Sequence, residues 1–130
     1  MNKINSFYVT IGDSSPGISY PIMNGVKISE LTLDLHVSLI LSDELEQFEV
    51  RLSDINGELI PKSRLPHGTY QILGPDKIKG TTLNLSVTFK DPTPYKRSTF
   101  TIELLKDSKV IDKLETSFFI VGGEADVKYW

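Results

Sequence analysis

Apolar and polar residues alternate along most of this chain. In the clearest run, six apolar residues are each separated by one residue, and they are Leu31, Leu33, Leu35, Val37, Leu39 and Leu41. A period of two places every second side chain on the same face of an extended strand. The run therefore predicts a strand over residues 27–41, with one face buried and the other exposed to water.

Shorter runs with the same alternation predict further strands, which cover residues 7–11, 48–53, 83–89, 100–104 and 110–121. Residues 54–57 (Asp-Ile-Asn-Gly) form a turn signal that joins residues 48–53 to 58–60 as a hairpin. Pro61 is expected to interrupt the next stretch, and a short edge strand follows near Tyr70 and Ile72. Pro21 likewise favours an irregular or edge segment before the long strand.

One short helical turn is expected between the long strand and the next. Asp43 and Glu46 have the spacing of a capping box, in which the first side chain caps the helix and the second reaches back to it. No longer helical periodicity is present. The fold class is therefore all-β.

The arrangement expected from these strands is an antiparallel two-sheet β-sandwich of about seven or eight strands. A closed barrel is the structural alternative, because strand alternation looks the same in both. The 130 residues are enough for one domain with its own core. We expect that domain to cover residues 1–123 and a C-terminal tail to cover 124–130, after the pair Gly122 and Gly123.

Two segments resemble those of bacterial immunoglobulin-like domains. One is the hairpin of residues 48–60, with Asp54 and the Asn56-Gly57 pair, and the other is the closing pair of strands, residues 98–104 and 117–121. The likeness is one of pattern and extends over most of the chain. It implies an immunoglobulin-like sandwich, although the paired cysteines of antibody domains are missing and Trp130 is the only tryptophan.

Composition narrows the classes of partner. The net charge of −3 supplies no general attraction to phosphate backbones or to anionic lipid, so neither nucleic acid nor a membrane is an expected partner. The longest apolar stretches have about four residues, against about 20 for a spanning helix. There is no cysteine and the first residues do not resemble a secretory signal, so we expect a cytoplasmic protein.

No pattern of catalytic or metal-binding residues is found. His36 is expected among the solvent-facing residues of its strand and His67 in a turn, and neither has a second metal ligand at a recognised spacing. The acidic cluster, defined as Asp43, Glu44, Glu46 and Glu49, is interpreted as a solvated surface rather than a calcium site. The sequence thus predicts no catalytic residue, no metal, no cofactor and no enzyme activity.

Two groups of residues are candidates for binding a partner. Tyr95, Lys96 and Arg97, together with Lys90, bring aromatic and basic groups to a proline-rich loop, a composition that can recognise an acidic peptide, a glycan or nucleic acid. Tyr129 and Trp130 place two aromatic rings at the end of the chain, where they could anchor a partner protein.

The leading hypothesis is a non-enzymatic intracellular interaction or scaffold module, an accessory part of a larger bacterial or phage assembly with a protein partner of unknown identity. Self-association through an edge strand is a variant of it. One alternative is a carbohydrate or small-molecule binding module that uses Tyr20, Tyr70, Tyr95 or His67 from loops at one end of the domain. Another is a hydrolase with carboxylates drawn from separate strands.

Overall fold

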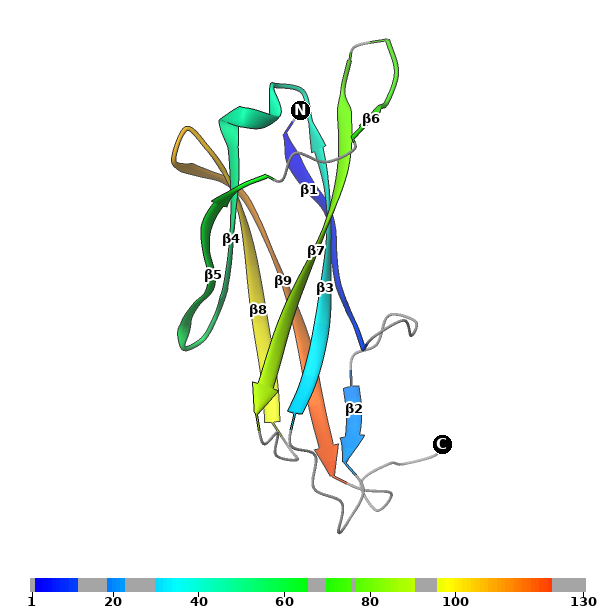
Figure 1. Ribbon diagram of the computed structural model, residues 1–130, viewed down its shortest axis with the longest axis vertical. Helices are drawn as coiled ribbons and strands as arrows, with labels where there is room; N and C mark the ends of the chain where they lie inside the picture. The colour runs from blue at the N-terminus through cyan, green and yellow to red at the C-terminus, as the bar shows by residue number, and fades with distance from the viewer. Residues whose placement is uncertain are drawn as a thin grey trace.

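Two β-sheets face each other in the computed structural model (Figure 1). The structure describes residues 2–11, 19–22, 30–65, 70–75, 77–90 and 96–122, with backbone alone for 19–22, 96 and 120–122. In these residues one sheet has four strands in the order β1-β3-β7-β6, and the other has five in the order β2-β9-β8-β4-β5. The expected all-β sandwich is confirmed.

The strands follow the chain in order, with one 3-10 turn, η1, after the third. Their bounds are β1 (Lys3–Thr10), β2 (Ser19–Ile22), β3 (Glu30–Leu41), η1 (Leu45–Gln47), β4 (Phe48–Asp54), β5 (Gly57–Arg64), β6 (Gln71–Ile72), β7 (Lys79–Lys90), β8 (Lys96–Lys106) and β9 (Lys109–Gly122). All neighbouring strands are antiparallel except β2, which pairs parallel with β9. Figure 1 shows the reason: β1, β2 and β9 all run in the same direction, so β2 joins the second sheet parallel to β9.

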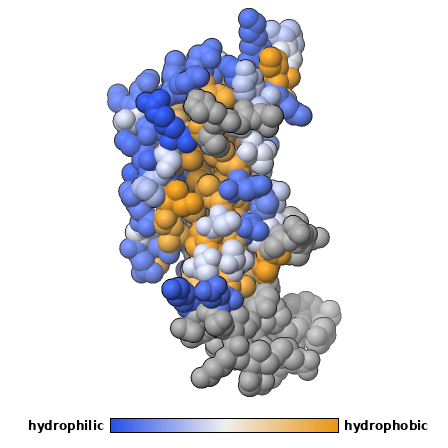
Figure 2. Space-filling view, viewed as in Figure 1, coloured by the Kyte–Doolittle hydropathy of each residue, from blue (hydrophilic) through white to orange (hydrophobic). Residues whose placement is uncertain are grey.

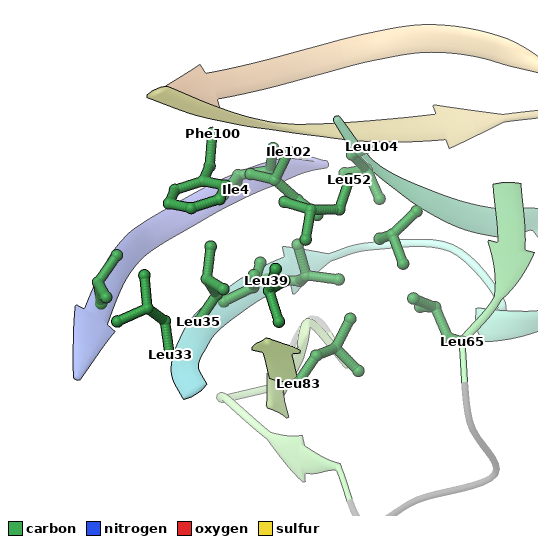
Figure 3. Close-up of a cluster of buried hydrophobic side chains, with 14 of the residues drawn as sticks. Ile4, Leu33, Leu35, Leu39, Leu52, Leu65, Leu83, Phe100, Ile102 and Leu104 are labelled. Atoms are coloured by element: carbon green, nitrogen blue, oxygen red, sulfur yellow. The ribbon is translucent and has the colours of Figure 1, made fainter. Parts of the chain in front are cut away.

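The core lies between the two sheets. The six apolar residues predicted to face inward from β3 are all buried, at 5% exposure or less. They pack against residues from β8 and β4, among them Phe100, Ile102 and Leu52, which point toward β3 in Figure 3. Burial of these side chains is the main stabilising term, because apolar area removed from water contributes about 25 cal/mol per Å².

A β-bulge in β1 changes which of its residues face the core. Ile4 lies opposite Leu39 of β3, but Ser6 lies opposite Ser38, so Asn5 is the extra residue on the β1 side. The bulge shifts the phase of the alternation by one residue. Ile4 is therefore buried as well as the predicted Val9, and Asn5 is turned to the solvent.

The hairpin predicted over residues 48–60 is present, and the closing pair of strands forms a second one. In the β4–β5 turn the backbone N–H of Asn56 donates to Asp54 Oδ1 at 2.8 Å, and Gly57 has a φ of +128°. The β8–β9 turn contains Asp107 and Ser108, with φ values of +50° and +65°. Consecutive positive φ values give a turn whose twist matches that of the flanking strands.

Two local predictions were wrong. Pro61 does not interrupt the chain, because β5 continues through it to Arg64; Pro61 lies where the register against β4 shifts and where no ladder hydrogen bond is required. The expected capping box is not formed either. The residue preceding η1 is Glu44, without a side-chain cap, and the carboxylate of Asp43 is bonded to Lys106 and Asn2 instead.

Candidate functional site

The outer face of the β1-β3-β7 sheet carries rows of hydrogen-bonded polar side chains. Thr32 of β3 bonds Thr88 of β7 at 2.9 Å, and the Ser86 hydroxyl donates to Asp34 Oδ1 at 2.8 Å. Each bond joins residues that are direct partners in the β3–β7 register. Such cross-strand pairs stabilise the sheet and give it a hydroxyl-rich outer surface.

His36 lies at the centre of this face, as predicted outside the core. Its Nδ1 donates to Asn84 Oδ1 at 2.7 Å, and its Nε2 is 2.7 Å from the hydroxyl oxygen of Thr10. The ring stacks on Tyr8 with 4.8 Å between centroids. Both ring nitrogens are therefore engaged, and His36 links three strands to one another.

A groove of about 480 Å³ opens on the same face, where the β6 segment stands beside β7. Its lining comes from four parts of the chain: Asn5 of β1, residues 38–40 of β3, the segment with Tyr70, Gln71 and Leu73, and residues 80–82 of β7. Among the described lining residues there is no Asp, Glu, Lys, Arg or His. The groove therefore offers hydroxyl, amide, aromatic and aliphatic groups.

The edge of β7 is the second feature of this sheet. On the side away from β3, β6 is the only described strand that pairs with β7, and it does so at Lys79 and Gly80 alone. The segment Thr81–Thr88, which we call the open edge, lies beyond that pairing. It extends for about 27 Å at 3.4 Å per residue.

Hydrophobic side chains are exposed beside the open edge. Leu85 on β7 and Leu59 and Ile60 on β5 are only partly buried while they pack against the core. The strand orders place β7 and β5 on the same side of the sandwich, opposite β1 and β9. Figure 2 shows hydrophobic atoms in a strip between the two layers on this side, which we call the seam.

Ion pairs on the other sheet have a structural role. Arg51 Nε donates to Glu103 Oε1 at 2.8 Å, and Glu58 lies 3.9 Å from the same guanidinium. The hydrogen bond from Arg51 lowers the pKa of Glu103 below its ordinary value. Because the three residues lie on the neighbouring strands β5, β4 and β8, the ion pairs link these strands on the outer face of that sheet.

The acidic cluster is not assembled into a cation site. Lys106 Nζ lies 2.8 Å from Asp43 Oδ2, and the amide of Asn2 donates to the same oxygen at 2.9 Å. The bond from Lys106 is the main reason that the pKa of Asp43 is lowered. Within the described residues, no three His, Asp or Glu side chains come close enough together to hold a metal ion.

The residues predicted to bind a partner are described only in part. Arg97 is exposed on β8, and its cross-strand neighbour on β9 is Phe119, which is also exposed. Lys96 begins β8, but its side chain lies outside the described residues, as do Tyr95, Tyr129 and Trp130. His67 and the side chain of Tyr20 also lie outside the described residues, so of the residues named for a ligand-binding module only Tyr70 is described in full.

Sequence reasoning missed most of the groove. Tyr70 was a candidate for ligand binding, but Asn5, Gln71 and Leu73 were not, because they carry no recognisable motif. The single available signal was the short strand near Tyr70 and Ile72, followed by a Gly-Pro pair. A strand of that length leaves much of its neighbour unpaired.

Neither a model of a known protein family nor a curated protein sequence matches this chain. In the described part of the chain, no helical segment has the length and apolar character of a membrane span.

Proposed function

We propose that this chain is a non-enzymatic interaction module of immunoglobulin-like topology that binds an extended segment of a partner protein along the open edge of β7. In this proposal it works inside the cell, as an accessory part of a larger bacterial or phage assembly. The lack of cysteine is consistent with a reducing compartment.

The strand order supports the immunoglobulin-like assignment. Immunoglobulin sandwiches have strands A, B, E and D in one sheet and C, F and G in the other, with an added C′ in variable-type domains. The order β1-β3-β7-β6 corresponds to A-B-E-D, and β9-β8-β4-β5 corresponds to G-F-C-C′. In that correspondence β6 is strand D, reduced to two residues.

The observation that carries the proposal is the open edge itself. A D strand of full length would pair with β7 along the open edge, but β6 stops after Gln71 and Ile72. An unpaired strand edge presents backbone N–H and C=O groups to any extended chain that reaches it. Addition of a strand there would satisfy these groups and continue the sheet.

The side chains of the open edge suit such an addition. Leu83 and Val87 are buried, Leu85 is half-buried, and Asn84 and Ser86 point to the solvent. A partner strand with the same alternation would place every second side chain in the seam, against Leu85, and expose the others. We therefore expect the partner segment to alternate apolar and polar residues over about eight positions.

A substitution pair tests the proposal. Leu85→Lys puts a charge that points inward at the open edge, a device that discourages strand addition. Leu114→Lys is the matched control. Leu114 is also a leucine within a strand, it is 36% exposed, and it lies on β9 opposite the core residue Ile102, away from the open edge. Ten-residue peptides would be selected for binding from a displayed library, and hydrogen exchange of the bound chain would be measured.

We expect the selected peptides to protect backbone amides of 81–88, to lose at least about tenfold in affinity for Leu85→Lys, and to bind Leu114→Lys as they bind the unchanged chain. Peptides that bind both variants equally, or that protect other residues, would refute the proposal. If the chain alone forms a dimer and Leu85→Lys dissociates it, then the occupant of the open edge is a second copy of this chain rather than a different protein.

A further inference from the structure

The groove beside β6 combines four neutral hydrogen-bonding side chains with two exposed apolar ones. The polar groups are the amides of Asn5 and Gln71 and the hydroxyls of Ser38 and Thr82. The apolar ones are Tyr70 and Leu73, which are 45% and 47% exposed. The volume of about 480 Å³ falls within the range of about 300–1,000 Å³ typical of small-molecule sites.

Backbone features build one wall of the groove. In the turn after β6, Gly74 has a φ of +122°, and the N–H of Leu73 donates to the carbonyl of Ile78 at 2.6 Å. Leu73 can then lie against β7 because residue 80 is glycine: a Cβ there would come within 3.0 Å of Leu73 Cδ1. Any larger residue at position 80 would displace Leu73.

The opposite wall depends on the bulge in β1. Asn5 is the extra residue of the bulge, and its exposed side chain reaches the groove. Bulges commonly redirect a side chain toward a functional site. Ser38, on the floor, is oriented by a hydrogen bond to the hydroxyl of Ser6.

A cation outside the lining lies near Tyr70. The ammonium of Lys79 lies 6.0 Å from the centroid of the Tyr70 ring, at the outer limit of a cation–π contact. The same ammonium donates to the carbonyl oxygen of Asp43 at 3.4 Å. The ammonium therefore lies near both the Tyr70 ring and the residues before η1.

We infer that the groove binds a neutral carbohydrate. A sugar ring has an apolar C–H face and a rim of hydroxyls that donate and accept hydrogen bonds. Tyr70 offers the aromatic surface for the C–H face, and amides and hydroxyls, which both donate and accept, surround it. None of the described lining residues carries a charge that would compensate an anionic sugar, and the Lys79 ammonium beside Tyr70 already donates to the Asp43 carbonyl, so the ligand class is neutral.

This inference does not rest on the proposed strand addition, although Thr81 and Thr82 both line the groove and begin the open edge. The two sites are told apart at residues they do not share: Tyr70 belongs to the groove alone, and Leu85 belongs to the edge and the seam alone. The variant Leu85→Lys is therefore expected to bind sugar as the unchanged chain does, and the variant Tyr70→Ala is expected to bind the selected peptides.

The test uses a panel of neutral trisaccharides of glucose, galactose, mannose and N-acetylglucosamine, with a glucuronate-containing trisaccharide as the charged comparison. Saturation-transfer NMR identifies binders, and calorimetry gives their affinities. Tyr70→Ala removes the aromatic surface. Tyr8→Ala is its matched control, because Tyr8 is 40% exposed on the same sheet face but stacks on His36 and lies outside the lining.

We expect at least one neutral trisaccharide to bind, Tyr70→Ala to weaken it about tenfold or more, and Tyr8→Ala to leave it within about twofold. Gln71→Ala is a second variant that removes hydrogen bonds without touching the ring, and it should also weaken binding. The inference is overturned if no neutral trisaccharide binds at millimolar concentration, if the glucuronate compound binds best, or if Tyr8→Ala is as harmful as Tyr70→Ala.

Discussion

The substitution Leu35→Ala tests whether β3 is the central strand of the core. Leu35 has no exposed surface, and its partners in register are Val9 of β1 and Leu85 of β7. The change deletes buried methyl groups and leaves a cavity that neighbours on both sides cannot easily fill. Substitutions of this kind cost about 2–5 kcal/mol, and we expect about 3 kcal/mol here.

That loss is large for a domain of this size, whose free energy of unfolding is expected to be about 5–15 kcal/mol. With a urea dependence of about 1.5 kcal/mol per molar, the midpoint of unfolding should fall by about 2 M. Urea titration followed by far-ultraviolet circular dichroism measures the midpoint and the slope together. The slope should not change, because the same surface is exposed on unfolding.

Leu114→Ala is the matched control for this prediction. The same groups are deleted, but Leu114 is 36% exposed at the edge of the core, so we expect a loss below about 1 kcal/mol. If the two variants had equal midpoints, or if Leu35→Ala cost less than Leu114→Ala, the packing of β3 between the sheets would be wrong.

Three further predictions concern local features. Gly57→Ala should lower the free energy of unfolding, measured by urea titration, by about 1 kcal/mol or more, because the φ of +128° at Gly57 disfavours a side chain. Gly80→Ala, which lacks that backbone strain, should lower it less. Arg51 lowers the pKa of Glu103, so the pair stabilises the folded state above the unfolded pKa of about 4.3, and this stability is lost as the pH falls through the folded pKa. The difference in urea midpoint between the unchanged chain and Glu103→Gln should therefore shrink below about pH 4. His36→Ala removes two side-chain hydrogen bonds and should lower the thermal midpoint measurably, with a cost of about 1–2 kcal/mol, and an unchanged midpoint would contradict the linking role of the ring.

The sequence was sufficient to predict the elements whose structure depends on a single strand or turn. Alternation from Leu31 to Leu41 identified β3 and all six of its inward residues. The turn at Gly57 was also readable, since its residue types tolerate positive φ. Both predictions use information that lies within a few residues of the chain.

Features that depend on pairing between strands could not be predicted. Ile4 is buried because of the bulge at Asn5, and a bulge is defined only against its partner strand. Asp43 was assigned to a helix cap, but its carboxylate bonds Lys106, 63 residues further along the chain. The groove has the same origin, because its walls come from β1, β3, β7 and the β6 segment, and no pattern in the sequence gives their register.

A comparison of the sheet edges favours β7 as the site of the proposed strand addition. Proteins protect exposed edges with prolines, bulges, charges or very short strands. In the described residues, β5 has Pro61 and two register shifts, β2 has Pro21, β1 has the bulge at Asn5, and β6 has two residues. The open edge from Thr81 to Thr88 has no proline and no charged residue. It also adjoins the seam, where core side chains remain partly exposed, so a strand added there would complete both the ladder and the core.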